Sequence, residues 1–274
     1  MVIKTWLDKA ATKLSKEHNI EKSRAYHEAH YIANTILGQI VTSDTQLSYI
    51  AQYCLDSALE KRTKHMPLSK IIQRKEFYSK MFVTNQHTLD PRAETEMIID
   101  LVRIKARSVI DLGTGTGCLI ITLLDKFDKA TGIAIDISTD ALKIAKENAA
   151  IYGLDKKIEF KQNNWANELE GHFDLVVANP PYVNLHETPT PELQYDPALG
   201  LFGDIKTYEQ MLESMCNIKF YQMLIETPKN LINELTQIAK KHFPKHIITT
   251  HEISNTEVAI IEVFQPDTPQ KIIL

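Results

Sequence analysis

The amino-acid sequence predicts an α/β fold, in which a seven-stranded mixed sheet flanked by helices follows a small helical domain. Residues 1–60 show helical periodicity and no strand pattern. From residue 108 onward, short apolar runs alternate with longer amphipathic segments, which is the pattern of a parallel sheet. The last two apolar runs are separated only by a turn at Ser254 and Asn255, so we expect a hairpin to close the sheet.

The composition is typical of a globular protein of a reducing compartment, and we expect a cytoplasmic location. The chain has 274 residues, is 43% hydrophobic and contains no apolar run of ~18 residues that could span a membrane. Its N-terminus turns polar too soon for a signal peptide. Cys54, Cys118 and Cys216 lie far apart, which argues against disulfides or a CxxC zinc site. His27 and His30 form a pair with no nearby third ligand, so no metal site is predicted.

Charge is distributed unevenly along the chain. Residues 1–80 carry 13 Lys and Arg against 8 Asp and Glu, whereas the remainder carries 18 against 27. This asymmetry indicates two modules with different surfaces. It is too mild to be the concentrated basic stripe of a nucleic-acid-binding protein, so we expect no stable nucleic-acid binding.

The N-terminal module, residues 1–75, is predicted to be a helical bundle. The segment 23–38 places apolar residues on one face and ends at Gly38, a plausible C-cap. A further helix is expected within 42–62, with Ser43 or Asp44 as its N-cap. The apolar face of that helix is predicted to consist of Leu47, Ile50, Cys54 and Ala58, flanked by Ala51, Leu55 and Leu59.

Residues 76–90 are expected to form a hairpin linker, and residues 91–274 the main α/β domain. The hairpin strands are predicted at 76–79 and 81–84. Helices are expected at 118–127, 139–153 and 228–243. The strands of the sheet are predicted at 108–112, 131–136, 157–161, 175–178, 220–226, 246–253 and 258–264.

A glycine-rich loop follows the first strand of this sheet in "VIDLGTGTGCLIITLL". Its GxGxG spacing differs from the GxGxxG fingerprint of dinucleotide-binding proteins, and it favours a ligand without a pyrophosphate. Asp136 lies nineteen residues beyond Gly117, at the end of the next strand, where a carboxylate can accept both hydroxyls of a ribose. Loop, acid and strand order together indicate S-adenosylmethionine. Asp111 either reaches the methionine ammonium group or caps the loop's own amides, and Cys118 is expected to be a packing residue.

A second motif, "FDLVVANPPYVN", ends an apolar strand in Asn179-Pro180-Pro181-Tyr182. The two prolines make the segment stiff and extended. It lies at the carboxyl end of a strand of a parallel sheet, where ligands bind. The side-chain oxygen of Asn179 and the carbonyl of Pro180 can each accept one hydrogen of a planar NH₂ group, and both hydrogen bonds strengthen as that nitrogen is methylated. Tyr182 offers a flat face to a planar amide or base. Asn179, Pro180 and Tyr182 are the predicted catalytic residues.

With both motifs placed, the chain resembles the peptide chain release factor glutamine methyltransferases of the HemK/PrmC type. The resemblance covers nearly the whole chain and includes the "PRAETE" stretch, where Ala93 replaces the proline usual in the family. It implies a class I S-adenosylmethionine-dependent methyltransferase fold, Rossmann-like, with the helical module helping to hold the substrate protein. The implied substrate is the glutamine side-chain amide in the Gly-Gly-Gln motif of class 1 release factors, and the chain is expected to be a monomer.

The resemblance also implies roles for individual residues. Trp165 matches the family tryptophan that lies against the adenine, and Asn179 matches the residue that contacts both cofactor and glutamine. Arg92 and Glu94 match the "PR-E" signature, and either bind substrate or join the linker to the catalytic domain. The implied cofactor-binding residues are Asp111, Gly113, Thr114, Gly115, Thr116, Gly117, Asp136, Trp165 and Asn179. The implied substrate-binding residues are Asn179, Pro180, Pro181, Tyr182, Arg92 and Glu94.

Two other functions fit parts of the pattern. An adenine amino-group methyltransferase of DNA or RNA also suits Asn-Pro-Pro-Tyr, but it needs base flipping and a surface for the phosphate backbone. We expect no target-recognition domain after the fold. A non-catalytic cofactor-binding partner module is the second alternative, and the intact glycine loop, Asp136 and Asn179–Tyr182 argue against it.

Overall fold

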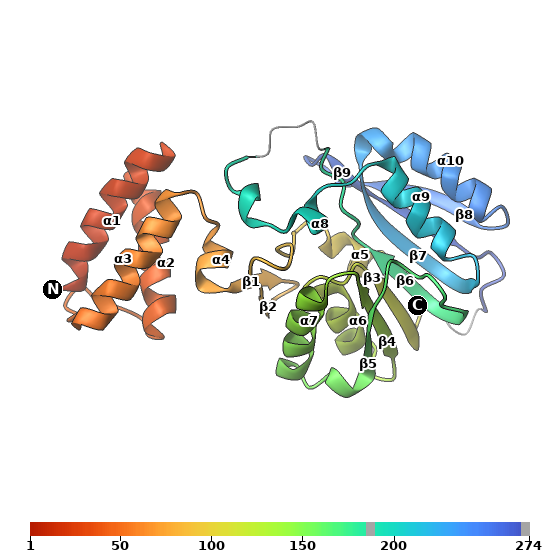
Figure 1. Ribbon diagram of the computed structural model, residues 1–274, viewed down its shortest axis with the longest axis horizontal. Helices are drawn as coiled ribbons and strands as arrows, with labels where there is room; N and C mark the ends of the chain where they lie inside the picture. The colour runs from red at the N-terminus through yellow and green to blue at the C-terminus, as the bar shows by residue number, and fades with distance from the viewer. Residues whose placement is uncertain (185–189, 270–274) are drawn as a thin grey trace. The chain divides into compact units, whose positions relative to one another are not determined.

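The computed structural model describes residues 1–184 and 190–269, which divide into a helical unit and a larger α/β unit (Figure 1). The helical unit consists of Met1–Arg74 together with residues 190–195. The α/β unit consists of residues 75–184 and 196–269. The chain therefore returns once to the helical unit after entering the α/β unit, an excursion that the sequence pattern did not indicate.

The helical unit is built on α1 (Ile3–His18), α2 (Lys22–Leu37), α3 (Tyr49–Thr63) and the short α4 (Leu68–Ile72). Its core contains Trp6 and Leu14 of α1, Ile32 of α2 and Leu55 of α3, all of them buried. Gly38 ends α2 in the left-handed conformation, as its position predicted. Among the described residues, no helix combines the length and the apolar character that crossing a membrane requires.

The predicted start of the third helix is wrong. Helix α3 begins at Tyr49, and its N-cap is Ser48, whose hydroxyl accepts a hydrogen bond from the amide of Ala51 at 3.1 Å. The region of Ser43 and Asp44 does not start a helix because the following segment pairs with the chain's first residues. There the amide of Ile3 donates to the carbonyl of Thr45, and the amide of Leu47 donates to the carbonyl of Met1, both at 2.9 Å.

The predicted apolar face of this helix changes with its start. Helix α3 buries Leu55, Ala58 and Leu59. Ile50 is 74% exposed and Cys54 is also exposed, so neither belongs to the core. Leu47 is buried, but it lies ahead of the helix.

The α/β unit holds a seven-stranded sheet in the order β5-β4-β3-β6-β7-β9-β8, as the class I fold requires. Strands β3 to β7 are parallel, and β9 runs antiparallel to both β7 and β8. This confirms the mixed sheet and its closing hairpin. Its strands are β3 (Ser108–Leu112), β4 (Thr131–Asp136), β5 (Ile158–Gln162), β6 (Gly171–Ala178), β7 (Ile218–Pro228), β8 (Ile247–Glu252) and β9 (Val258–Phe264), and a separate hairpin is formed by β1 (Arg74–Phe77) and β2 (Lys80–Val83).

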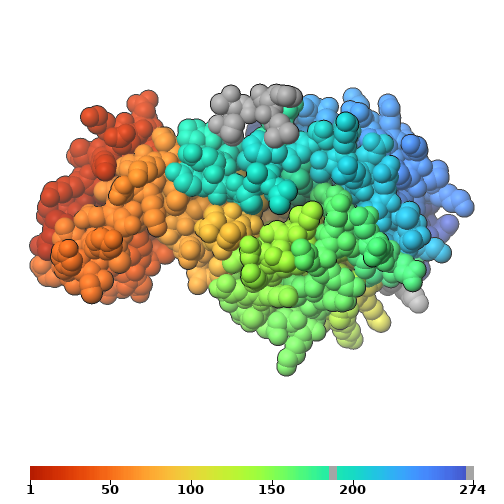
Figure 2. Space-filling model, in the orientation of Figure 1, coloured from red at the N-terminus to blue at the C-terminus, as the bar shows by residue number. Residues whose placement is uncertain are grey.

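Helices cover both faces of this sheet. Alternate strand residues point to opposite faces, so Val109 joins one apolar core and Ile110 the other. The first core includes α5 (Glu96–Asp100), α6 (Cys118–Lys126), α7 (Thr139–Ile151) and the hairpin. The second core lies under α9 (Ile205–Ser214) and α10 (Ile232–His242), whose cyan and blue atoms form part of the surface in Figure 2.

Short helical segments complete the chain. Helix α8 (Ala198–Leu201) and the 3-10 turn Leu193–Tyr195 precede α9. Helix α9 starts with a capping box, in which the Asp204 side chain accepts from the amides of Lys206 and Thr207. Two further 3-10 turns, Asp155–Lys157 and Lys229–Leu231, stand before β5 and α10.

Candidate functional site

A pocket of about 460 Å³ opens in the α/β unit where β3, β4 and β6 end. In an open parallel sheet, this carboxyl edge is where ligands bind. The pocket is lined by many of the residues that the sequence indicated: Arg92, Gly113, Thr114, Gly115, Thr116, Asp136, Trp165, Asn179 and Pro181. The other indicated residues lie outside its lining: Glu94, Asp111, Gly117, Pro180 and Tyr182.

The glycine loop joins β3 to α6, and its glycines adopt a backbone conformation that residues with a side chain rarely adopt. Gly113, Gly115 and Gly117 have φ values of 73°, 55° and 79°, in the left-handed region that favours glycine. The amides of Gly113 and Thr114 donate to the carbonyl of Ile135 at 2.9 and 2.8 Å, which ties the loop to β4. The loop therefore forms a tight wall of the pocket, on which backbone rather than side chains meets a ligand.

Asp136, at the end of β4, lines the pocket next to the glycine loop and is fixed by backbone hydrogen bonds. One carboxylate oxygen accepts from the amide of Gly115 and the other from the amide of Ser138, each at 2.9 Å. Burial raises the pKa of Asp136, although these hydrogen bonds oppose the rise. An ionised carboxylate has about four acceptor positions. Asp136 therefore retains capacity to accept hydroxyl groups from a ligand in the pocket.

Asp111 is buried behind the loop. Its Oδ2 accepts from the hydroxyl of Thr114 at 2.6 Å, and desolvation by burial raises its pKa to about 7. Its Oδ1 is buried and has no hydrogen-bond partner among the described residues, so the two roles that the sequence left open both stay predictions. The thiol of Cys118 lies at the start of α6, where burial raises its pKa to about 12, as suits a packing residue.

Trp165 also lines the pocket, with its ring next to Gly113. A Cβ added to Gly113 would lie 3.5 Å from the Trp165 ring, so the indole and the loop backbone are in close approach. Trp165 adopts a φ of 54°, which is uncommon for a bulky residue. Such strained residues concentrate at binding sites, where surrounding structure holds them.

Asn179 stands at the end of β6 with its amide orientation fixed. Its Nδ2 donates to the hydroxyl oxygen of Thr95 at 2.9 Å, and the Thr95 hydroxyl in turn donates to Glu226 at 2.6 Å. Since the only hydroxyl proton of Thr95 goes to Glu226, Thr95 can only accept from Asn179. The side-chain oxygen of Asn179 is buried and has no hydrogen-bond partner among the residues that the structure describes. This oxygen can therefore accept a hydrogen bond from a ligand.

Glu226, near the end of β7, accepts the hydrogen bonds at the end of this network. It is fully buried, and its second oxygen accepts from the hydroxyl of Tyr182 at 3.1 Å. Desolvation raises the pKa of Glu226 to about 7, against the hydrogen bonds from Thr95 and Tyr182. Burial and the Glu226 charge raise the pKa of Tyr182, which keeps its hydroxyl protonated as a donor.

The backbone of the two prolines is held by a glycine from far along the chain. A Cβ added to Gly203 would lie 2.0 Å from the carbonyl oxygen of Pro181, a distance that no side chain permits. Next to this contact, the amide of Gly203 donates to the carbonyl of Val183, and the amide of Val183 donates to the carbonyl of Leu201. The segment after Tyr182 is thereby closed against residues 201–203, and Pro180 itself is buried.

Arg92 borders the same pocket. Its guanidinium donates to Asp196 at 3.0 Å, which joins the "PRAETE" segment to the loop that leads into α8. Glu94 is half-buried and contributes a negative charge that helps raise the pKa of Glu226. Arg92 thus lines the pocket, whereas Glu94 lies outside its lining and affects the nearby Glu226 through its charge.

Sequence reasoning missed Thr95, Glu226 and Gly203. A carboxylate inside the apolar run "QMLIET" was a detectable signal, because an unpaired charge is seldom buried in a strand. Thr95 and Gly203 had no such signal, since their partners are more than 20 residues away in the chain. Residues His87, Leu89 and Leu199 also line the pocket and were not indicated.

Comparison with known proteins adds sequence relatives. Residues 76–193 match the family model described as "Methyltransferase small domain". A "Bifunctional methyltransferase" of Rickettsia felis is 32% identical over 243 residues, covering 74% of this chain and 46% of that protein. A "Release factor glutamine methyltransferase" of Rhodospirillum rubrum is 30% identical over 215 residues, covering 74% of this chain and 65% of that protein. The chain thus spans only part of the length of these relatives.

Among solved structures, the hMettl16 catalytic domain in complex with MAT2A 3'UTR hairpin 6 superimposes with a TM-score of 0.53 at 14% identity. The match covers 78% of this chain and 80% of that one, and it bears on the fold alone. Strand order, glycine loop and sequence relatives agree with one another. The chain is thus similar in sequence to release factor glutamine methyltransferases of the HemK/PrmC type, and it has the class I methyltransferase fold.

Proposed function

We propose that this chain transfers a methyl group from S-adenosylmethionine to the side-chain amide nitrogen of the glutamine in the Gly-Gly-Gln motif of class 1 release factors. The sequence relatives and the matching family model support the reaction class, and the name of the Rhodospirillum rubrum relative favours glutamine over adenine as the acceptor. The observation that carries the choice of an NH₂ group as the methyl acceptor is the buried side-chain oxygen of Asn179, which has no partner among the described residues. A buried acceptor without a partner costs about 1–3 kcal/mol, so its retention favours a ligand donor at this point.

The residues of the pocket fit the cofactor. Asp136 has acceptor capacity for a ribose diol, and the Trp165 ring offers a flat surface beside Gly113 for an adenine. A side chain at Gly113 or Gly115 would project into this space or strain the loop. When bound, S-adenosylmethionine supplies an electrophilic methyl group carried by a sulfonium.

Asn179 orients the acceptor nitrogen. Its side-chain oxygen accepts one N–H of the substrate amide, and the carbonyl of Pro180 is proposed to accept the other. The chain Glu226–Thr95–Asn179 prevents the Asn179 amide from flipping, because a flipped amide would present its NH₂ to another NH₂. As positive charge develops on the substrate nitrogen, these hydrogen bonds strengthen, which stabilises the transition state over the ground state. The acceptor's proton becomes acidic on methylation, so no strong base is required.

The test supplies methyl-labelled cofactor to the full chain with three separate acceptors: an intact class 1 release factor, DNA and tRNA. We expect label in the release factor, and mass spectrometry should place one methyl group on the glutamine of the Gly-Gly-Gln peptide. A release factor in which alanine replaces that glutamine is the matched control and should remain unlabelled. Label in DNA or tRNA but not in the release factor would overturn the proposal in favour of an adenine amino group.

A further inference from the structure

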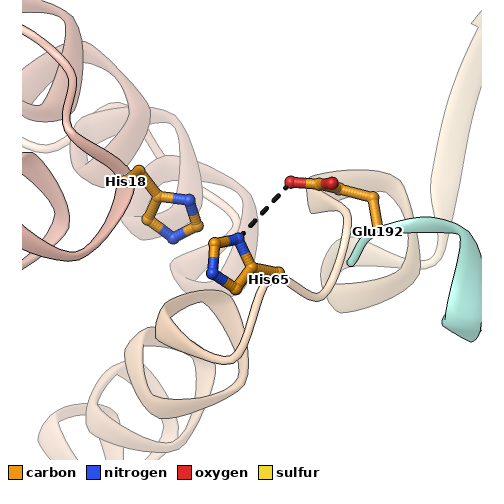
Figure 3. Close-up of side chains that lie close together, drawn as sticks. All are labelled: His18, His65 and Glu192. Carbon is orange, nitrogen blue, oxygen red and sulfur yellow. Dashed lines mark ion pairs between the residues drawn. The ribbon is translucent and has the colours of Figure 1, made fainter. Parts of the chain in front are cut away.

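Three potential metal ligands meet in the helical unit, and none of them lines the pocket. His18 ends α1, His65 lies two residues beyond α3, and Glu192 belongs to residues 190–195. One ligand atom from each lies within 4.8 Å of the others. Figure 3 shows the His65 ring between His18 and Glu192. Because three separate segments of the chain converge here, the cluster is not a repeat along one helix face.

The tautomer of His18 suits metal binding. Its Nε2 lies 2.9 Å from the carbonyl oxygen of Arg62, which can only accept, so Nε2 carries the proton and Nδ1 keeps its lone pair. Metal-binding histidines commonly donate their other ring N–H to such a carbonyl.

The spacing of His65 and Glu192 also agrees with two ligands of one ion. Nδ1 of His65 and Oε1 of Glu192 are 3.5 Å apart. That is longer than the N–H···O distance of about 2.7–3.2 Å. Two ligand atoms bound at about 2.0–2.1 Å in a tetrahedral zinc site lie roughly 3.3 Å apart. These side chains are 36% and 42% exposed, which leaves a path by which an ion can enter.

The charges around the cluster permit a cation. The guanidinium of Arg62, next to His18, forms a close ion pair with Glu28. Glu192 supplies the negative charge of the ligand set itself, beside the imidazoles of His18 and His65.

We propose that His18, His65 and Glu192 bind a divalent transition-metal ion of the zinc type, with a fourth position open to water. Two imidazoles and a carboxylate are a ligand set that Zn²⁺ accepts in proteins. The ion would fasten residues 190–195 to the helical unit, where the Tyr195 hydroxyl already donates to the carbonyl of Lys64 at 2.6 Å. The next residue, Asp196, pairs with Arg92, so this fastening restrains one end of the loop that continues into the pocket lining.

The test titrates Zn²⁺ alone into the metal-free full chain by calorimetry and measures bound zinc after dialysis. The variants are His65→Ala and Glu192→Gln. His27→Ala is the matched control, because His27 is an exposed histidine of the same unit outside the cluster. We expect one equivalent at micromolar affinity in the wild type and in the control. Each cluster variant should lose affinity by at least ~10-fold, the lower limit reported for loss of a ligand's supporting partner.

A second measurement distinguishes lost ligands from lost folding. Circular dichroism should show the same helix content in all variants. Co²⁺ should give the intense visible bands of a four-coordinate site in the wild type and in His27→Ala, but not in the two cluster variants. Two results would overturn the proposal: no stoichiometric zinc in the wild type, or equal losses in His27→Ala and His65→Ala. The second result would show dispersed binding to surface histidines.

Discussion

The two sides of the pocket are built in different ways. On the side of the glycine loop, hydrogen bonds join residues close in the chain, such as Asp111 with Thr114, or neighbouring strands, such as Asp136 with Gly115. On the side of Asn179, they join residues 84 and 131 positions apart. On the first side, Asp136 accepts from two backbone amides and keeps further acceptor capacity, and Oδ1 of Asp111 is buried without a partner among the described residues. On the second side, the side-chain oxygen of Asn179 is the atom without such a partner. We therefore expect that cofactor binding and catalysis can be perturbed separately.

The largest separation is expected from Asn179→Ala. This change removes the unpartnered acceptor, so kcat should fall by about 10²–10³-fold, as when one preorganised hydrogen-bonding group is removed from an active site. Cofactor affinity measured by calorimetry should stay within about tenfold, because the interaction acts mainly in the transition state. Asn164→Ala removes a different amide from the same pocket and is the control. Equal losses in affinity and rate would make Asn179 chiefly a cofactor contact.

Gly203→Ala tests the same side through the backbone. The added Cβ would meet the Pro181 carbonyl at 2.0 Å, so the Asn-Pro-Pro-Tyr segment must shift. We expect a loss of about 1–3 kcal/mol in unfolding free energy from overpacking. A displacement of ~1 Å can reduce kcat by roughly 10²-fold. Gly200→Ala is the matched control, because its Cβ would make only ordinary contacts at 3.5 and 3.8 Å. If both variants behave alike in denaturant and in turnover, the Pro181 contact does not position the segment.

Asp136→Ala addresses the side of the glycine loop. It removes acceptors for two loop amides and, under the proposed function, for the cofactor's hydroxyls. Cofactor Kd should rise on the order of 10–100-fold, which corresponds to a charge-assisted hydrogen bond of about 1.5–3 kcal/mol. At saturating cofactor, kcat should change much less. Asp140→Ala, in the first turn of α7 with a side chain that is 48% exposed, is the control. An unchanged calorimetric Kd would contradict the ribose assignment.

The smallest effect is expected from pH, through Glu226. Below its pKa of about 7, protonated Glu226 can donate to Thr95, and Thr95 is then free to donate to a flipped Asn179 amide. We therefore expect kcat/KM to decline by up to about tenfold per pH unit as pH falls below 7. In Glu226→Gln this dependence should be absent, and activity should be low at every pH. A wild-type profile that is flat between pH 6 and 8 would exclude this role of Glu226.

Stability should change with pH in the opposite sense to activity. The folded-state pKa of Glu226 is raised from 4.5 to about 7, so the folded protein holds a proton that the unfolded chain releases. Unfolding free energy should therefore fall as pH rises from about 4.5 to 7, by on the order of 3 kcal/mol for this group. Glu226→Gln should reduce the fall without abolishing it, since Asp111 has a raised pKa of the same kind. Denaturant unfolding at pH 5 and 8 measures the difference.

The same contrast between local and distant contacts explains what the sequence could predict. The seven-stranded mixed sheet, its closing hairpin and the tight turn of the glycine loop depend on periodicity and on residues near each other in the chain, and those predictions are confirmed. The start of α3 was wrong because Thr45 and Leu47 pair with the first residues of the chain, a contact that no local pattern encodes. Thr95 and Gly203 were missed for the same reason, whereas Glu226 was missed although a carboxylate within an apolar run was a detectable signal. The roles of the individual pocket residues remain predictions.

The helical unit is assembled from two stretches of the chain rather than one. A chimera that grafts Met1–Arg74 of this protein onto another methyltransferase would therefore transfer an incomplete module, without Glu192 and Tyr195. Conversely, a fragment that begins at Lys75 would carry residues 190–195 as an orphaned insert, with the Tyr195 hydroxyl deprived of the Lys64 carbonyl. Modular exchange within this family is then expected to succeed only when both stretches are moved together.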